Sequence, residues 1–153
     1  MMCLDQMNVM SLCVILPDKR LIMSRKVATD NILNPWSITR ETPFMGLPTA
    51  ACLRLLNEYF GLDGNNQKIG TITKERLIQY NRVWIHPFAY HVKGSITFEC
   101  PAEDEQRAVS WDVLCDELIQ EAVVMESGLN SSKYTTTAVY STAKLHAEGH
   151  FNL

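Results

Sequence analysis

The chain has 153 residues, of which 46% are hydrophobic and 20% are charged. This is the balance of one globular domain with its own core, and it excludes collagen, coiled coils and disordered chains. The formal net charge of -3 provides no long-range attraction to DNA or to an anionic membrane. No apolar run approaches the roughly 20 residues that a membrane-spanning helix needs. We therefore expect a single domain over residues 1–153, with no DNA-binding signature and no membrane segment.

The five cysteines are widely spaced and include no C-x-x-C pair. An odd number at such spacing argues against a disulfide framework or a zinc knuckle. The N-terminus also lacks the basic region of a signal peptide. These features predict reduced, mostly buried thiols in a cytoplasmic protein.

The first third of the chain predicts a strand hairpin followed by a long loop. Met7 to Leu16 is apolar and rich in strand-forming residues, Pro17-Asp18 marks a turn, and the apolar run resumes at Leu21. Residues 27–47 contain several asparagines and prolines, which predict a loop with one short strand near Trp36 to Ile38. A loop of that length usually has a function.

A helix is predicted to begin at Pro48, where proline is tolerated, and to end at Gly61 in a left-handed cap followed by Leu62. A turn follows at residues 63–66. The apolar positions of the helix form two stripes, Ala51, Cys52, Leu55 and Tyr59 in one and Leu53, Leu56 and Phe60 in the other. A helix that is apolar on most sides is usually buried on most sides.

Residues 69–85 and 88–100 predict strands, with a hairpin turn at Lys93-Gly94. Pro101 to Gln106 predicts a charged loop. Asp112 is expected to cap a second helix that ends near Ser127, and a third helix is expected through the 130s and 140s. This order of elements predicts an α/β (α+β) fold, a mixed sheet packed between helices.

The segment from Pro48 to Leu62 resembles the helix of the Nudix (MutT-like) hydrolase superfamily. The family pattern is G-x5-E-x7-R-E-U-x-E-E-x-G-U, where U is a bulky aliphatic residue. The matching residues are Arg54, Leu56, Glu58, Gly61 and Leu62. The hairpin at Ser11 to Arg25, Trp36 ahead of the box and the Val109 to Leu114 stretch are also similar to the family.

The box, at residues 40–62, is degenerate. Its opening glycine is Arg40, its first glutamate is Gly46, and two further glutamates are Leu55 and Tyr59. Only Glu58 remains of the four glutamates.

The resemblance implies a chemistry for which these losses matter. Nudix enzymes hydrolyse pyrophosphates in nucleoside diphosphates with Mg²⁺, which requires hard oxygen ligands. Positions 55, 58 and 59 fall on one helix face. Glu58 alone can hold a hydrated Mg²⁺ through bound phosphates, but not the usual cluster of ions. The simpler interpretation of Glu58 is an ion pair with Arg54, four residues before it.

Other residues offer further candidates. If the chain is active, Glu99, Glu103 or Glu105 would supply another metal ligand or the base, although a solvated loop is the commoner role of such residues. Trp36, Arg40 and Arg54 are the candidate ligand-binding residues. Arg25 and Lys26 are either phosphate contacts or surface cations. The histidines of residues 146–150 do not form a metal motif and belong to a frayed end.

Three hypotheses follow. The leading one is a non-catalytic binding or interaction module that takes a nucleotide or a protein partner. The alternative is a divergent Mg-dependent nucleoside diphosphate-X pyrophosphohydrolase. The third is an interaction protein, such as a homodimer that uses the apolar helix face or the long loop.

Overall fold

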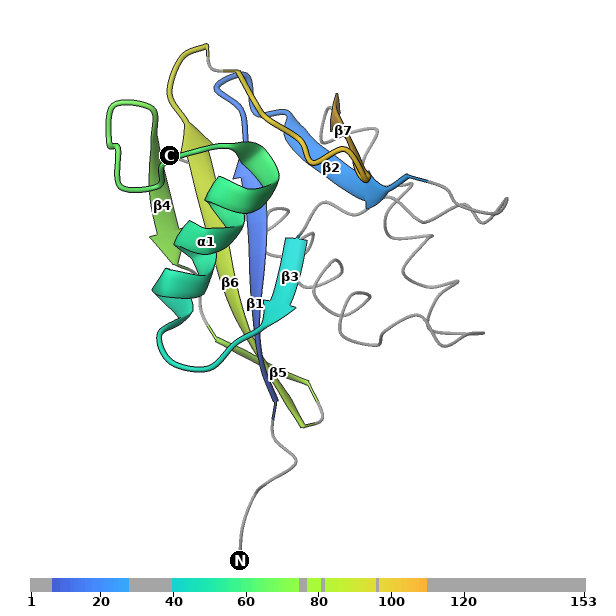
Figure 1. Ribbon diagram of the computed structural model, residues 1–153. Coiled ribbons are helices and arrows are strands. Elements are labelled where there is room, and N and C mark those ends of the chain that lie inside the picture. Colours follow the sequence, from blue (N-terminus) through green and yellow to red (C-terminus); the bar gives the residue numbers. More distant parts are fainter. Residues whose placement is uncertain (1–6, 28–39, 75–76, 81, 96, 110–153) are drawn as a thin grey trace, which may run out of the picture.

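The computed structural model describes residues 7–27, 40–74, 77–80, 82–95 and 97–109 (Figure 1). Within these ranges no helix has the length and apolar character needed to cross a membrane. The helices expected after Asp112 and the short strand near Trp36 lie outside these ranges.

The described residues form one mixed sheet and one helix. In chain order the elements are β1 (Met7–Ile15), β2 (Leu21–Lys26), β3 (Arg40–Pro43), α1 (Pro48–Phe60), β4 (Gly70–Lys74), β5 (Ile78–Tyr80), β6 (Val83–Val92) and β7 (Asp104–Val109). The strand order is β4-β6-β1-β2-β7, with β3 also paired to β1 and β5 to β6. β1 and β6 are parallel, and every other pair is antiparallel. The predicted mixed sheet is confirmed.

The predicted hairpin between β1 and β2 is also confirmed. Its turn is closed by hydrogen bonds from the Leu16 N–H to the Arg20 carbonyl (2.8 Å) and from the Lys19 N–H to the Leu16 carbonyl (2.9 Å). β2 pairs with β1 only at Leu21, opposite Ile15, and then pairs with β7 over its whole length. On the same edge, β3 pairs with residues 9–12 of β1. A strand at Arg40–Pro43 was not expected, because the sequence analysis placed a loop there.

Two predictions about the later strands were wrong. Residues 97–100 form no strand, because the Glu99 N–H bonds to the last turn of α1, at the Phe60 carbonyl (3.0 Å). The charged stretch predicted as a loop instead contributes to β7, where its side chains pair across to β2. The prediction missed this strand because its residues are charged and their partners are distant in the chain. Arg25, for example, lies 80 residues before Glu105.

β6 is longer than expected because it continues through Pro87. Proline has no N–H, so it is rare inside a sheet. β5 pairs with residues 83–85 of β6 and β4 pairs with residues 88–92 on the same edge. Pro87 thus lies where no described strand pairs with that edge.

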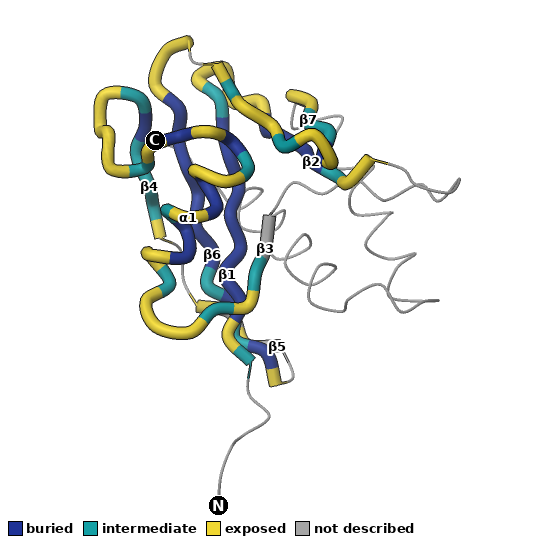
Figure 2. The backbone as a smooth tube through the Cα atoms, in the orientation of Figure 1, coloured by how far each residue is buried: buried dark blue, intermediate teal, exposed yellow. Residues whose placement is uncertain are grey.

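The core lies between α1 and one face of the two central strands, β1 and β6. The residues that pack there are Met10, Leu12 and Val14 of β1, Phe88, Tyr90 and Val92 of β6, and Ala51, Cys52, Leu55, Leu56 and Phe60 of α1. Both central strands are also buried on the opposite face, so dark blue runs along them in Figure 2. A strand buried on both faces has a nearly continuous apolar sequence instead of an alternating one.

The end of α1 is as predicted. Gly61 has φ 65° and ψ 27°, and its N–H bonds to the Asn57 carbonyl (3.1 Å). The Leu62 N–H bonds to the Leu56 carbonyl (3.0 Å), and the Leu62 side chain is buried. This is the left-handed cap that satisfies free carbonyls at a helix end.

Gly70 of β4 allows Tyr90 of the neighbouring strand to pack over it. A Cβ atom at Gly70 would overlap the Tyr90 ring and hydroxyl. Tyr90 is fully buried, and its hydroxyl has no hydrogen-bond partner among the described residues. Burial, and then the charge of Asp63, raise the pKa of Tyr90, so the hydroxyl stays protonated.

We expect Gly70→Ala to lower the free energy of unfolding by about 1–3 kcal/mol, because the new methyl group overpacks the Tyr90 site. Tyr90→Phe alone should cost little, since it removes a buried hydroxyl that has no partner. In the double variant, the missing hydroxyl should recover part of the loss. Urea unfolding followed by circular dichroism measures all three. Additive effects of the two substitutions would contradict this packing.

Candidate functional site

The candidate site is the surface of α1 that carries the degenerate box. Leu55, at a lost glutamate position, is 3% exposed and belongs to the core between helix and sheet. Tyr59, at another, is half-buried against the same core. Both positions therefore pack inward, as the two apolar stripes predicted. Gly46, at the third lost position, is exposed with φ 92° and has nothing near its Cβ direction.

The last turn of α1 is tied to β7. The Gln106 side-chain amide donates a hydrogen bond of 2.6 Å to the Tyr59 carbonyl. Carbonyls in the last turn of a helix have no partner within the helix, so an external donor is needed. The sequence analysis missed Gln106, because no local signal links it to a residue 47 positions earlier.

Glu58 is exposed and lies beside Arg54. The Arg54 Nε and Glu58 Oε1 atoms are 4.0 Å apart, and the two side chains are 54% and 52% exposed. A solvated pair of this spacing contributes only about 0.3–0.5 kcal/mol. The predicted ion pair is confirmed.

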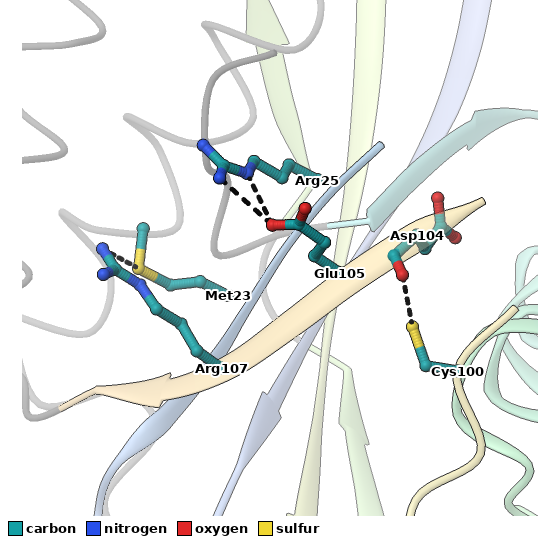
Figure 3. Close-up of polar contacts among 6 residues, drawn as sticks. All are labelled: Met23, Arg25, Cys100, Asp104, Glu105 and Arg107. Carbon is teal, nitrogen blue, oxygen red and sulfur yellow. Dashed lines mark hydrogen bonds and ion pairs between the residues drawn. The ribbon is translucent and has the colours of Figure 1, made fainter. Parts of the chain in front are cut away.

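The three later glutamates lie in different surroundings. Glu105 is bound by Arg25, whose Nε and Nη2 atoms both lie 3.1 Å from Glu105 Oε2 (Figure 3). Glu103 is exposed, and its carbonyl accepts from the Val27 N–H (2.8 Å). Glu99 lies over the end of α1, where its Cβ is 2.7 Å from the position of a Cβ at Gly61. Across the residues that the structure describes, no three or more His, Cys, Asp and Glu side chains gather as a metal site.

The ribbon formed by β2 and β7 carries contacts that the sequence analysis did not anticipate. Figure 3 shows Arg25 beside Glu105, the Arg107 Nη2 atom near the Met23 sulfur (3.8 Å), and the Cys100 thiol donating to the Asp104 carbonyl (3.3 Å). The first two pairs are register partners. Arg25, one of the candidate phosphate contacts, is thus held by a carboxylate.

Two of the three ligand-binding candidates lie wholly or partly outside the residues that the structure describes. Trp36 lies outside the described residues. The backbone of Arg40 belongs to β3, opposite Leu12, but its side chain lies outside what the structure describes. Arg54 is on the exposed edge of α1.

The one cysteine of α1 has no thiolate chemistry near neutral pH. Cys52 is fully buried in the core, and burial raises the pKa of its thiol to about 12. Because nucleophilic attack and metal ligation both need the thiolate, Cys52 is a packing residue.

The chain has a Nudix-like fold. No family model and no curated protein matches its sequence. A MutT structure, from work on Aliivibrio salmonicida and Vibrio cholerae, superposes with a TM-score of 0.58 at 8% identity, covering 91% of this chain and 98% of that one. The C-terminal domain of mouse MUTYH, in complex with human PCNA, gives a TM-score of 0.60 at 11% identity, covering 97% of this chain and 92% of that one.

A further similar structure is the Nudix domain of Shewanella oneidensis NrtR in complex with ADP ribose. Its TM-score is 0.50 at 11% identity, covering 73% of this chain and 77% of that one. Identities this low show the fold alone. The fold that the resemblance implied is therefore confirmed.

Restoring a box glutamate at position 55 tests whether this face of α1 is packed against the sheet or open to solvent. We expect Leu55→Glu to lower the free energy of unfolding by about 3 kcal/mol or more, because it places a carboxylate in the core. Asn57→Glu is the matched control: it puts the same side chain on the exposed edge and should change stability by less than about 0.5 kcal/mol. Thermal unfolding with and without Mg²⁺ gives the readout. A stable Leu55→Glu variant that Mg²⁺ stabilises further would mean that the face is open.

Proposed function

We propose that this chain is a non-catalytic binding or interaction module with a Nudix-like fold, which takes a nucleotide or a protein partner. The observation that carries the proposal is the direction of the box residues. Leu55 and Tyr59 pack into or against the core, and the remaining glutamate pairs with Arg54 at the surface.

The physical reason concerns metal charge. Mg²⁺ at a pyrophosphate neutralises phosphate oxygens and orients the attacking water, and it binds through several oxygen ligands. Glu58 is the one carboxylate of α1 that could serve as such a ligand. Glu105 would have to leave Arg25 to provide another. A divergent Mg-dependent pyrophosphohydrolase is the alternative, in which Glu58, Glu99, Glu103 and Glu105 would act together.

Two kinds of ligand have precedents on this fold. The similar NrtR domain is in complex with ADP ribose, and the similar MUTYH domain is in complex with PCNA. For a nucleotide we propose Trp36, Arg40 and Arg54 as the contacting residues, with Trp36 stacking on the base. For a protein partner or a second copy, the contact surface would lie outside the apolar face of α1, because that face packs on the sheet. A cytoplasmic location remains a prediction.

The test is magnesium-dependent turnover on a panel of nucleoside diphosphate conjugates that includes ADP ribose. We expect no turnover that depends on Glu58, so wild type and Glu58→Gln should be equal within error. Asp63→Asn serves as the control, because it removes an exposed carboxylate outside the box. Fast turnover that Glu58→Gln abolishes and Asp63→Asn preserves would refute the proposal and establish the alternative.

The same proteins allow binding to be measured without turnover. Calorimetric titration with ADP ribose in the absence of metal tests the nucleotide, and light scattering after size exclusion tests self-association. A binding module should give a saturable signal in at least one of the two measurements. If the protein is a monomer and Arg54→Gln gives the same result as wild type in every titration, that outcome would count against these contacts.

A further inference from the structure

The turn between β1 and β2 and the segment after β6 lie at the opposite end of the central strands from β5, at the top of Figure 1. Together they line an open pocket of about 450 Å³, which is a second candidate site. The lining residues used below are Leu16, Asp18, Arg20, Val92, Gly94, Ser95 and Phe98. Ligand pockets typically measure about 300–1,000 Å³, so a small organic molecule has room here.

The floor of the pocket is apolar and already formed. Val92 is 5% exposed, and Leu16 and Phe98 are partly buried against the core of α1 and the sheet. Phe98 is held by an edge-to-face contact with Phe60, with ring centroids 6.5 Å apart. An apolar group entering the pocket would therefore meet a preformed surface and would not have to create one.

One wall presents Asp18 and Arg20 together, and the carboxylate holds the guanidinium group in place. Asp18 accepts from the Arg20 Nε (2.6 Å) and from the Arg20 backbone N–H (3.1 Å). These bonds, the backbone one first, lower the pKa of Asp18, so its carboxylate stays ionised and keeps hold of Arg20. Within the described residues, the two terminal amino groups of Arg20 have no partner. Such a fork matches a carboxylate or a phosphate with two parallel hydrogen bonds.

The other wall adds N–H and O–H donors that have no protein partner within the described residues. Gly94 has φ 74°, and nothing lies within 4 Å of its Cβ direction. In the part of the chain that the structure describes, neither the backbone N–H groups of Gly94 and Ser95 nor the Ser95 hydroxyl makes a hydrogen bond to protein. Asp18 is the acidic residue of the lining, and its carboxylate is bonded to Arg20, whereas Glu99 lies against Gly61 and does not line the pocket.

We propose that this pocket binds a small organic anion, a carboxylate or phosphate group joined to an apolar body. Arg20 and Ser95 would bind the anionic group, and the body would rest on Leu16, Val92 and Phe98. The pocket contains none of the box residues, so the proposal is independent of the function proposed above.

The test is a titration of the isotope-labelled protein followed by NMR. Phenyl phosphate and phenylacetate are the probes, because each joins a ring to one of the two anions. Both should shift the amide signals of Arg20, Gly94 and Ser95 saturably, and the tighter probe identifies the preferred anion. Benzyl alcohol lacks the charge and inorganic phosphate lacks the ring, so both should bind much more weakly. If inorganic phosphate gave shifts as large as those of phenyl phosphate, the apolar floor would not contribute to binding. That result would overturn the proposed role of Leu16, Val92 and Phe98.

Arg20→Gln should weaken the better probe about tenfold or more, the effect of losing a charge-assisted pair. Lys19→Gln is the matched control, because it removes the same charge from the neighbouring residue, which does not line the pocket. If Arg20→Gln disturbs the turn, Ser95→Ala provides a second measure and should weaken binding severalfold. Equal affinities for wild type, Arg20→Gln and Ser95→Ala, or shifts confined to other residues, would overturn the proposal.

Discussion

The packing of α1 against β1 and β6 is the interaction on which the rest of the described structure depends. It joins residues from the first, middle and later parts of the described chain into a single core. It buries five side chains of the helix, Ala51, Cys52, Leu55, Leu56 and Phe60, and the helix residues that face water are Thr49, Ala50, Arg54, Asn57 and Glu58. A helix cannot use one position both as a core residue and as a hydrated metal ligand, because a buried carboxylate is costly unless it is paired. Leu55 therefore fills the core, and this position offers no oxygen ligand.

Local rules were sufficient for the hairpin and for α1. Pro48 and Gly61 mark the helix because backbone geometry restricts each residue wherever it occurs, and the Arg54–Glu58 pair follows from helical spacing alone. The inward direction of Leu55 and Tyr59 followed from the two apolar stripes. These features depend on neighbours within a few residues, so the sequence pattern contains them.

The remaining features depend on distant partners. β7 is charged, and it becomes a strand because Arg25 and β2 lie beside it. Residues 97–100 alternate like a strand but bond to the end of α1. Pro87 is accommodated by a gap between two partner strands. The bond from Gln106 to Tyr59 and the pocket beside Arg20 both join segments that no local pattern connects. The positions of carboxylates relative to one another could not be predicted for the same reason.

The single residue pair between β1 and β2 has a mechanical consequence. Beyond Leu21, β2 and β7 leave the plane of the main sheet as a two-stranded arm that is fastened to itself along six positions. The Gln106 amide then forms a second anchor, at the helix end. Ile22 of the arm also packs in the core beneath α1, so side-chain packing holds the arm as well as that amide. Loss of the Gln106 bond would therefore remove one tie between the arm and the last turn of α1 and leave the packing of Ile22 in place.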